Sequence, residues 1–240
     1  TVFFSGCSLG CVFCQNEEIS HRDVGRPVTV ERLRQICVEL IAQGAHNINF
    51  VTPTHYSHIV ARVLERPLPV PVVFNSGGYD SVSALQSLAG KVDIYLPDLK
   101  YMDSAPAGRY SAAPDYPERA KAALAEMVRQ AGDPVFDEEG MMKRGVIVRH
   151  LVLPGQAEDS KAVIRYLFET YGRRIYLSIM SQFTPTGDLS SWPELNRTLT
   201  PEEYDQVVDY AVDLGVENGF TQEGAAADES FIPPFGCEGV

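Results

Sequence analysis

Residues 1–16 read Thr-Val-Phe-Phe-Ser-Gly-Cys-Ser-Leu-Gly-Cys-Val-Phe-Cys-Gln-Asn, and the rest of the fold can be placed from this segment. The run Val2-Phe3-Phe4 is apolar and predicts a short buried strand. Cys7, Cys11 and Cys14 follow it with the spacing C-x3-C-x2-C. A four-iron cube prefers four thiolates, so three closely spaced cysteines can hold three irons and leave the fourth open. An open coordination position is typical of a catalytic metal site, so the segment predicts a cluster that binds a further molecule.

Two other uses of these cysteines stay open. A zinc site could combine the three thiolates with His21, which lies seven residues after Cys14. Structural zinc sites usually join two short cysteine hooks from separate places, however, and only one hook is present. Disulfides or free thiols are the second alternative. Disulfides are disfavoured because the chain has 5 cysteines, an odd and low number, and no secretory segment is visible.

Length and charge narrow the class of protein. A chain of 240 residues can bury a full core, and one domain is the natural expectation. The net charge of −12 repels phosphate backbones, so nucleic acid is not expected as a partner. No apolar run approaches the roughly 20 residues needed to cross a bilayer, so no membrane partner and a cytoplasmic location are expected. The chain begins with Thr1 inside a strand-like run, which predicts further residues upstream in the natural protein.

Short apolar runs alternate with helical periods along the whole chain. The runs expected to be strands are 1–5, 47–51, 70–74, 92–96, 145–153 and 175–180. The helices expected between and after them are 29–43, 55–65, 81–88, 117–130, 160–171 and one that starts with the capping box at Thr200. Six strand–helix units in alternation predict an α/β fold with a parallel sheet wrapped by helices. Functional groups then sit at the C-terminal ends of the strands, where the cysteines lie.

Three segments interrupt this alternation. A Pro/Ala/Ser-rich loop is expected before the helix at 117–130, an insertion at 133–143, and a long polar loop at 182–199. The core domain is expected to span residues 1–218. Residues 219–240, rich in glycine, proline and acidic residues, are expected to form a C-terminal surface tail.

The cysteine spacing, with the aromatic Phe13 just before Cys14, resembles the signature of the radical S-adenosylmethionine superfamily. The segment from Phe3 to Asn16 is similar to the branch that includes pyruvate formate-lyase-activating enzymes. This resemblance implies a partial (βα)6 TIM-like barrel with parallel strands and outer helices. It implies that Cys7, Cys11 and Cys14 bind a [4Fe-4S] cluster whose fourth iron is chelated by S-adenosylmethionine. It also implies that the backbone at Phe13 contacts the adenine.

The ends of the second and third strands carry polar residues. Thr52 and Thr54 stand where the family usually has a Gly-Gly-Glu-type motif that receives the methionyl ammonium. They offer hydroxyl and carbonyl acceptors but no carboxylate, so this contact departs from the family pattern. Asn75 and Ser76 open a tight polar turn after the third strand, and the resemblance implies that they face the ribose or the methionyl part.

The fourth and fifth strands contribute charges. Asp98 and Lys100 alternate with apolar residues, so they share one face, either as a mutually satisfied ion pair or, as the resemblance implies, beside the cofactor. Arg149 lies within an apolar strand, and a guanidinium suits a carboxylate, so it is expected to face the cofactor.

The sixth strand places Ser178, Met180 and Gln182 on one face, which is expected to contact the cofactor. The activating enzymes often carry a histidine near the position of Gln182. An amide can hydrogen-bond a ribose but cannot act as a base, so no proton-transfer role is expected there.

The function that the resemblance implies is reductive cleavage of S-adenosylmethionine to a 5′-deoxyadenosyl radical, which abstracts hydrogen from a substrate. That substrate is expected to be a protein, with a glycyl residue as the target, and the electron donor a flavodoxin or ferredoxin. An iron–sulfur electron-transfer protein is one alternative, although it would use four thiolates in a smaller fold. A peptide-modifying radical enzyme is another, although it usually adds a cysteine-rich C-terminal extension.

Overall fold

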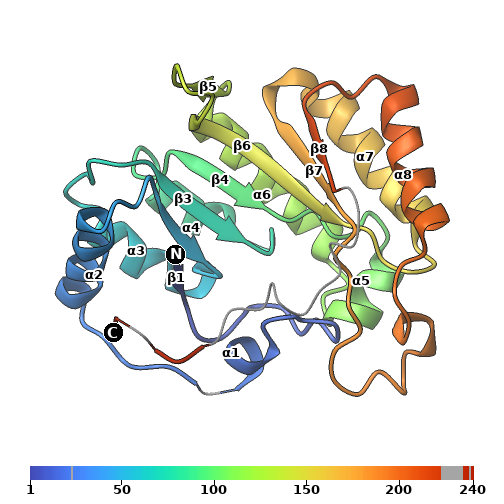
Figure 1. Ribbon diagram of the computed structural model, residues 1–240, viewed down its shortest axis with the longest axis horizontal. Helices are drawn as coiled ribbons and strands as arrows, with labels where there is room; N and C mark the ends of the chain where they lie inside the picture. Colours follow the sequence, from blue (N-terminus) through green and yellow to red (C-terminus); the bar gives the residue numbers. More distant parts are fainter. Residues whose placement is uncertain (23, 223–234, 238) are drawn as a thin grey trace.

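The computed structural model describes residues 1–22, 24–222, 235–237 and 239–240 (Figure 1). A parallel sheet forms its centre, with strand order β1-β2-β3-β4-β6-β7-β8. The strands are β1 (Val2–Phe3), β2 (Ile48–Val51), β3 (Val72–Ser76), β4 (Ile94–Pro97), β6 (Met142–Leu151), β7 (Tyr176–Met180) and β8 (Gly219–Thr221). β1 and β8 are the two edges of the described sheet. The described strands thus form an open sheet with two edges rather than a closed ring. The predicted fold class, an α/β fold with a partial TIM-like barrel, is confirmed.

Helices cover one face of this sheet. They are α2 (Val30–Ala42), α3 (Ser57–Val63), α4 (Val82–Ser87), α6 (Tyr116–Ala131), α7 (Ala157–Tyr171) and α8 (Pro201–Leu214). In Figure 1, α2 and α3 lie near β1, whereas α7 and α8 lie near β8. None of the helices in the described residues is long and apolar enough to cross a bilayer.

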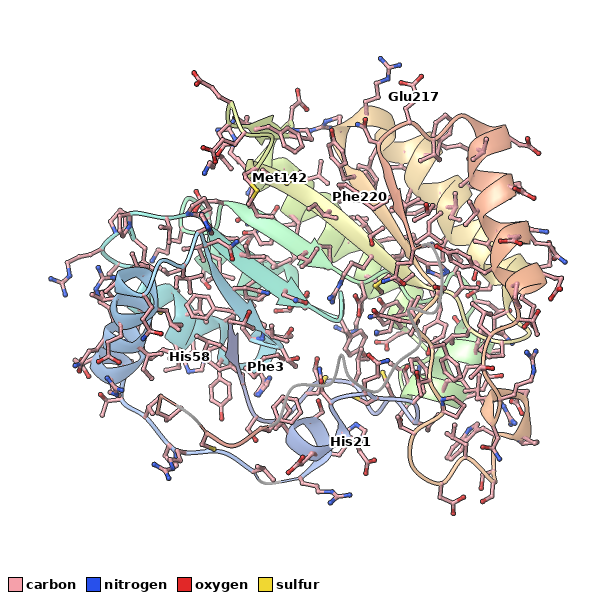
Figure 2. The ribbon with its side chains drawn as sticks, viewed as in Figure 1. Phe3, His21, His58, Met142, Glu217 and Phe220 are labelled. Carbon is pink, nitrogen blue, oxygen red and sulfur yellow. The ribbon has the colours of Figure 1, made fainter. Side chains whose placement is uncertain are left out.

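Strand alternation divides the sheet residues into two sets. Phe50, Phe74, Tyr95 and Val148 are fully buried on the side of the helices, where they form the core. Their neighbours in sequence point to the concave side of the sheet, because successive side chains of a strand face opposite ways. Phe3 on β1 and Phe220 on β8, labelled in Figure 2, are 37% and 50% exposed, and their rings pack against Phe235 and Tyr176.

Local signals fix two of the predicted helix starts. The Thr29 hydroxyl accepts a hydrogen bond from the Arg32 amide and caps α2. Thr200 and Glu203 form the predicted capping box at the start of α8. The expected helix at 55–65 begins instead with a 3-10 turn, η1 (Thr54–Tyr56), and continues as α3.

Two further corrections concern the predicted loop before α6 and the number of strands. Much of the Pro/Ala/Ser-rich loop forms a helix, α5 (Ser104–Ser111). Asp103 caps it through the Ala105 amide at 2.8 Å, and Pro106 falls in the first turn, where proline is tolerated. The sheet has 8 strands within the described residues, not the expected six. The predicted insertion at 133–143 contributes β5 (Val135–Phe136), which pairs antiparallel with β6.

The other additional strand is β8. It is formed by the first residues of the predicted C-terminal tail, and it pairs with β7. Most of the remaining tail lies outside the described residues, so its path stays a prediction. The predicted polar loop at 182–199 contains one short 3-10 turn, η3 (Pro193–Leu195). A second such turn, η2 (Gly172–Arg174), follows α7.

Candidate functional site

The three clustered cysteines lie in the loop that follows β1. Cys11 is buried, Cys7 and Cys14 are half-buried, and all three are free thiols. Backbone hydrogen bonds close this loop: the Glu17 amide donates to the Cys14 carbonyl at 3.1 Å, and the Gly6 amide to the Ile19 carbonyl at 2.8 Å. The loop then enters the short helix α1 (Glu17–His21). The three cysteines therefore lie in one loop whose backbone is held by hydrogen bonds.

Burial dominates the acidity of these thiols. It raises the pKa of Cys7, and it raises the pKa of Cys11 to about 11, although the nearby Lys100 ammonium opposes the effect at both. Both thiols are therefore protonated at neutral pH in the free protein. A thiol must lose its proton to bind a metal, so a metal that binds here releases protons.

A cluster of opposite charges stands beside the cysteines, at the ends of β4 and β6. Lys100 Nζ lies 2.6 Å from Asp98 Oδ2, and Arg149 Nη2 lies 2.7 Å from Asp98 Oδ1. Burial alone would raise the pKa of Asp98, but Arg149 and Lys100 outweigh it and hold that pKa below its usual value. Burial would lower the pKa of Lys100, but Asp98 keeps it well above the usual range. The predicted ion pair is thus present, and Arg149 joins it.

The ion cluster carries an excess of one positive charge, because two cations share one carboxylate. The three side chains are only 14% to 26% exposed. Arg149 also donates to the Asn75 side-chain oxygen at 2.8 Å, while its Nε is buried without a hydrogen-bond partner among the described residues. Buried charge of this kind needs a partner. The site is therefore suited to an anionic group such as a carboxylate.

The end of β2 carries a conformational exception. Thr52 has a φ of 56°, in the left-handed region that a β-branched residue seldom adopts, and its amide donates to the Asn75 carbonyl at 2.9 Å. Such exceptions cluster at functional sites. Thr54 begins η1 directly afterwards, and both threonines are half-buried. Thr52 and Asn75 are therefore neighbours, while their contacts with the cofactor stay a prediction.

Ser76 is placed differently from Asn75. Its hydroxyl donates to the Asp80 carboxyl at 2.6 Å and accepts from the Gly78 amide at 3.2 Å. Asp80 is 4% exposed, and burial raises its pKa. Asp80 is a buried acid that sequence reasoning did not identify, because nothing in its spacing relates it to Ser76.

The predicted residues at the end of β7 approach the cysteine loop from the other side. Ser178 and Met180 are half-buried, and Gln182 Nε2 reaches the Met180 sulfur at 3.9 Å. Gln15, next to Cys14, donates from its side chain to the Gln182 carbonyl at 2.9 Å. Phe13 packs against Phe183 with ring centroids 5.9 Å apart. The structure thus brings the two ends of the predicted site together. The cofactor roles of these residues stay predictions.

Three other side chains were missed from the sequence. Tyr116 places its hydroxyl 3.0 Å from the Lys100 amide, from which it accepts, and 2.9 Å from the Gly77 carbonyl, to which it donates. Ser111 and Tyr101 form a hydrogen-bonded chain that ends at Cys11. All three lie far from the cysteines in sequence, so no spacing could have indicated them.

The side chains around the cysteines distinguish a zinc site from an iron–sulfur site. Within the described residues, no three His, Cys, Asp or Glu side chains lie close enough to hold one metal ion. His21, labelled on α1 in Figure 2, is exposed, so the alternative zinc site is not formed there. In an iron–sulfur cube each cysteine binds a different iron, so the sulfurs stand further apart than around one ion. The three free thiols of Cys7, Cys11 and Cys14 match such a cube in ligand type and number, since they can supply three of its four thiolate positions.

Comparisons with known proteins agree with this chemistry. A family model described as the radical SAM superfamily matches residues 1–167. A protein of Methanocaldococcus jannaschii, described as uncharacterized, is 28% identical over 222 residues, which cover 88% of this chain and 61% of that protein. The chain therefore spans about three-fifths of that relative's length.

Solved structures share the fold at low identity. A radical SAM methyltransferase from Sphaerobacter thermophilus aligns with a TM-score of 0.60 and 15% identity, over 92% of this chain and 64% of that one. SuiB of Streptococcus suis, bound to the precursor peptide SuiA, aligns with a TM-score of 0.62 and 14% identity, over 93% of this chain and 48% of that one. SuiB bound to S-adenosylmethionine gives a TM-score of 0.60 at 15% identity, over 93% of this chain and 50% of that one.

Proposed function

Because this chain belongs to the radical SAM superfamily, whose members use a [4Fe-4S] cluster and S-adenosylmethionine, we propose that it is an enzyme of the activating type. When bound, the two cofactors supply the electron and the sulfonium C–S bond whose reductive cleavage gives methionine and a 5′-deoxyadenosyl radical. In this proposal the radical abstracts hydrogen from a glycyl residue of a protein substrate. A low-potential donor such as flavodoxin or ferredoxin supplies the electron.

One observation carries the proposal: the free thiols of Cys7 and Cys11 lie beside the Asp98–Lys100–Arg149 ion cluster. The three cysteines would hold the iron–sulfur cluster through their thiolates. The ion cluster, with its excess positive charge, orients the methionyl part through its carboxylate. The Asp98 carboxylate and the Asn75 oxygen offer acceptors to the ammonium, in place of the acid that the Thr52–Thr54 segment lacks. Burial of these groups excludes water from the reacting bond.

The cofactor test uses the anaerobically reconstituted protein reduced with dithionite. We expect a reduced-cluster electron paramagnetic resonance signal that changes when S-adenosylmethionine is added, together with formation of 5′-deoxyadenosine and methionine. The variant Lys100→Met should keep its iron but bind the cofactor at least about tenfold more weakly, since one charge-assisted contact is worth about 1.5–3 kcal/mol. A signal indifferent to S-adenosylmethionine would leave the electron-transfer alternative and end this proposal.

The substrate test uses purified pyruvate formate-lyase as the probe, because the resemblance is to its activating enzymes. A glycyl-radical doublet that appears only with the complete mixture supports the activating assignment. Formation of 5′-deoxyadenosine with no glycyl radical would remove this substrate while it leaves the cleavage reaction intact.

A peptide-modifying activity is the second candidate. It is favoured by the structural likeness to SuiB, which was solved with a precursor peptide. Phe3 and Phe220, on the two edge strands of the sheet, are 37% and 50% exposed and offer apolar surface to a peptide chain. Modification of a short synthetic peptide, detected as a mass change that depends on S-adenosylmethionine, would separate this activity from the activating one.

A further inference from the structure

Cys11 ends a buried chain of hydrogen-bonding groups. Its sulfur lies 3.0 Å from the Ser111 hydroxyl, and that hydroxyl lies 2.8 Å from the Tyr101 phenol oxygen. The exposed fractions are 7% for Cys11, 0% for Ser111 and 1% for Tyr101. Water therefore does not compete for these bonds, and each counts for more than it would at the surface.

The backbone fixes Ser111 beside Cys11 independently of this hydroxyl. The Gly10 amide donates to the Ser111 carbonyl at 3.1 Å, and the Val12 amide donates to the Tyr110 carbonyl at 2.9 Å. These two bonds flank Cys11 and join the cysteine loop to the end of α5. Removing the Ser111 hydroxyl should therefore leave the loop in place.

Binding of iron to Cys11 fixes which group donates each hydrogen bond between Cys11, Ser111 and Tyr101. In the free protein either the thiol or the hydroxyl can donate. A cysteine that binds iron is a thiolate without a proton, so it can only accept. The Ser111 hydroxyl must then donate to the Cys11 sulfur, and its oxygen is left to accept from the Tyr101 hydroxyl.

The other two cysteines lack an equivalent donor among the described residues. Cys7 accepts from the Leu9 amide at 3.4 Å. Cys14 lies 3.6 Å from the Ser20 hydroxyl, which is half-buried. The short, fully buried O–H donor is thus specific to Cys11.

We propose that Tyr101 and Ser111 are positioning residues that raise the reduction potential of the cluster through an O–H···S hydrogen bond to Cys11. Reduction adds negative charge that is shared by the thiolates, so a donor aimed at a sulfur stabilises the reduced form more than the oxidised form. Tyr101 strengthens the bond because it donates to the oxygen that itself donates. The inference rests on the proposed cluster at Cys7, Cys11 and Cys14.

The test is a potentiometric titration of the reconstituted protein without S-adenosylmethionine, followed by electron paramagnetic resonance. Ser111→Ala should lower the equilibrium constant for one-electron reduction about tenfold, which is a shift of about 59 mV to more negative potential. Tyr101→Phe should shift the potential in the same direction by less. Ser111→Thr, which keeps a hydroxyl, should lie nearest the wild type. The matched control Ser20→Ala, which removes the longer and half-buried contact to Cys14, should shift the potential by clearly less than Ser111→Ala.

Iron and sulfide analysis separates the failures. A Ser111→Ala protein with full iron content and the wild-type potential would overturn the inference, as would a shift no larger than that of Ser20→Ala. If Ser111→Ala does not assemble a cluster, Tyr101→Phe decides, because it leaves Cys11 and Ser111 in place. An unmoved potential in Tyr101→Phe would then refute the hydrogen-bonded chain. Wild-type protein that takes up no iron would instead refute the proposed cluster itself.

Discussion

Removal of one cation from the buried ion cluster is expected to destabilise the fold strongly. In Arg149→Met, Asp98 loses the ion pair at 2.7 Å and keeps only Lys100. For charge centres about 4 Å apart, an effective dielectric constant of 20 gives about 4 kcal/mol. The Arg149 side chain is 26% exposed, so solvent screens part of this energy. Loss of one partner of a buried pair costs about 3–5 kcal/mol, and the lower end, about 3 kcal/mol, is expected here.

The assay is thermal and urea unfolding of the cluster-free protein. A loss of about 3 kcal/mol should lower the midpoint of a chain of this size by about 6–12 °C. The matched control is Arg173→Met, whose partner Glu217 and whose own side chain are 66% and 78% exposed, so a change below about 0.5 kcal/mol is expected.

The pH dependence supplies a second check on Arg149→Met. The pKa of Asp98 is lower in the folded state than in the unfolded state. The ionised carboxylate therefore stabilises the fold at pH values above its unfolded-state pKa, and this stabilisation is lost as the pH falls through its folded-state pKa. The deficit of Arg149→Met should therefore be largest at neutral pH and shrink below about pH 4. Equal deficits in Arg149→Met and Arg173→Met, or a deficit that does not depend on pH, would refute the reasoning.

Three further outcomes are expected. Gly78→Ala should prevent normal folding or lower the free energy of unfolding by more than about 3 kcal/mol, because a Cβ there would overlap the Asp98 carbonyl oxygen. The control Gly90→Ala has open space around it and a similar φ, so it should cost about 1 kcal/mol in the same urea titration. Tyr116→Phe should cost about 1–3 kcal/mol, since the Gly77 carbonyl and the Lys100 amide both lose their partner; a change within error would contradict the role of that hydroxyl. Burial lowers the pKa of His150 to about 4, so the free energy of unfolding of the wild type should fall as the pH drops from about 6.5 through 4. His150→Asn should show a weaker pH dependence of unfolding across this range.

Several features of the fold and the site could be predicted because they depend on residues that are close together in the sequence. The spacing of Cys7, Cys11 and Cys14 predicts three ligands of an iron–sulfur cluster, and the structure places all three as free thiols in the loop that follows β1. Strand alternation predicted that Asp98 and Lys100 share a face, and the two side chains do form an ion pair. The strand–helix alternation likewise predicted the parallel sheet. Each of these features depends on residues that lie close together in the sequence.

What could not be predicted depends on distant residues or on weak local signals. Ser111 reaches Cys11 across 100 positions, and no periodicity relates the two. The sequence predicts a loop where α5 forms, because the proline, serine and glycine of this segment outweigh the capping signal of Asp103. The strand β8 has 3 residues and begins with glycine, so only its pairing with β7 identifies it. These features are decided by tertiary contacts rather than by propensity.

The bonds between the cysteine loop and the end of α5 also bear on how the protein is made. The loop emerges from the ribosome before its partners Tyr110 and Ser111, which follow about 100 residues later. At ordinary synthesis rates of about 5–20 residues per second, the loop waits at least about 5 s without its anchor. During that interval the thiols are open to oxidation or to the wrong metal. An iron–sulfur cluster assembled after α5 has docked would therefore meet the loop with its anchor at Tyr110 and Ser111 already in place.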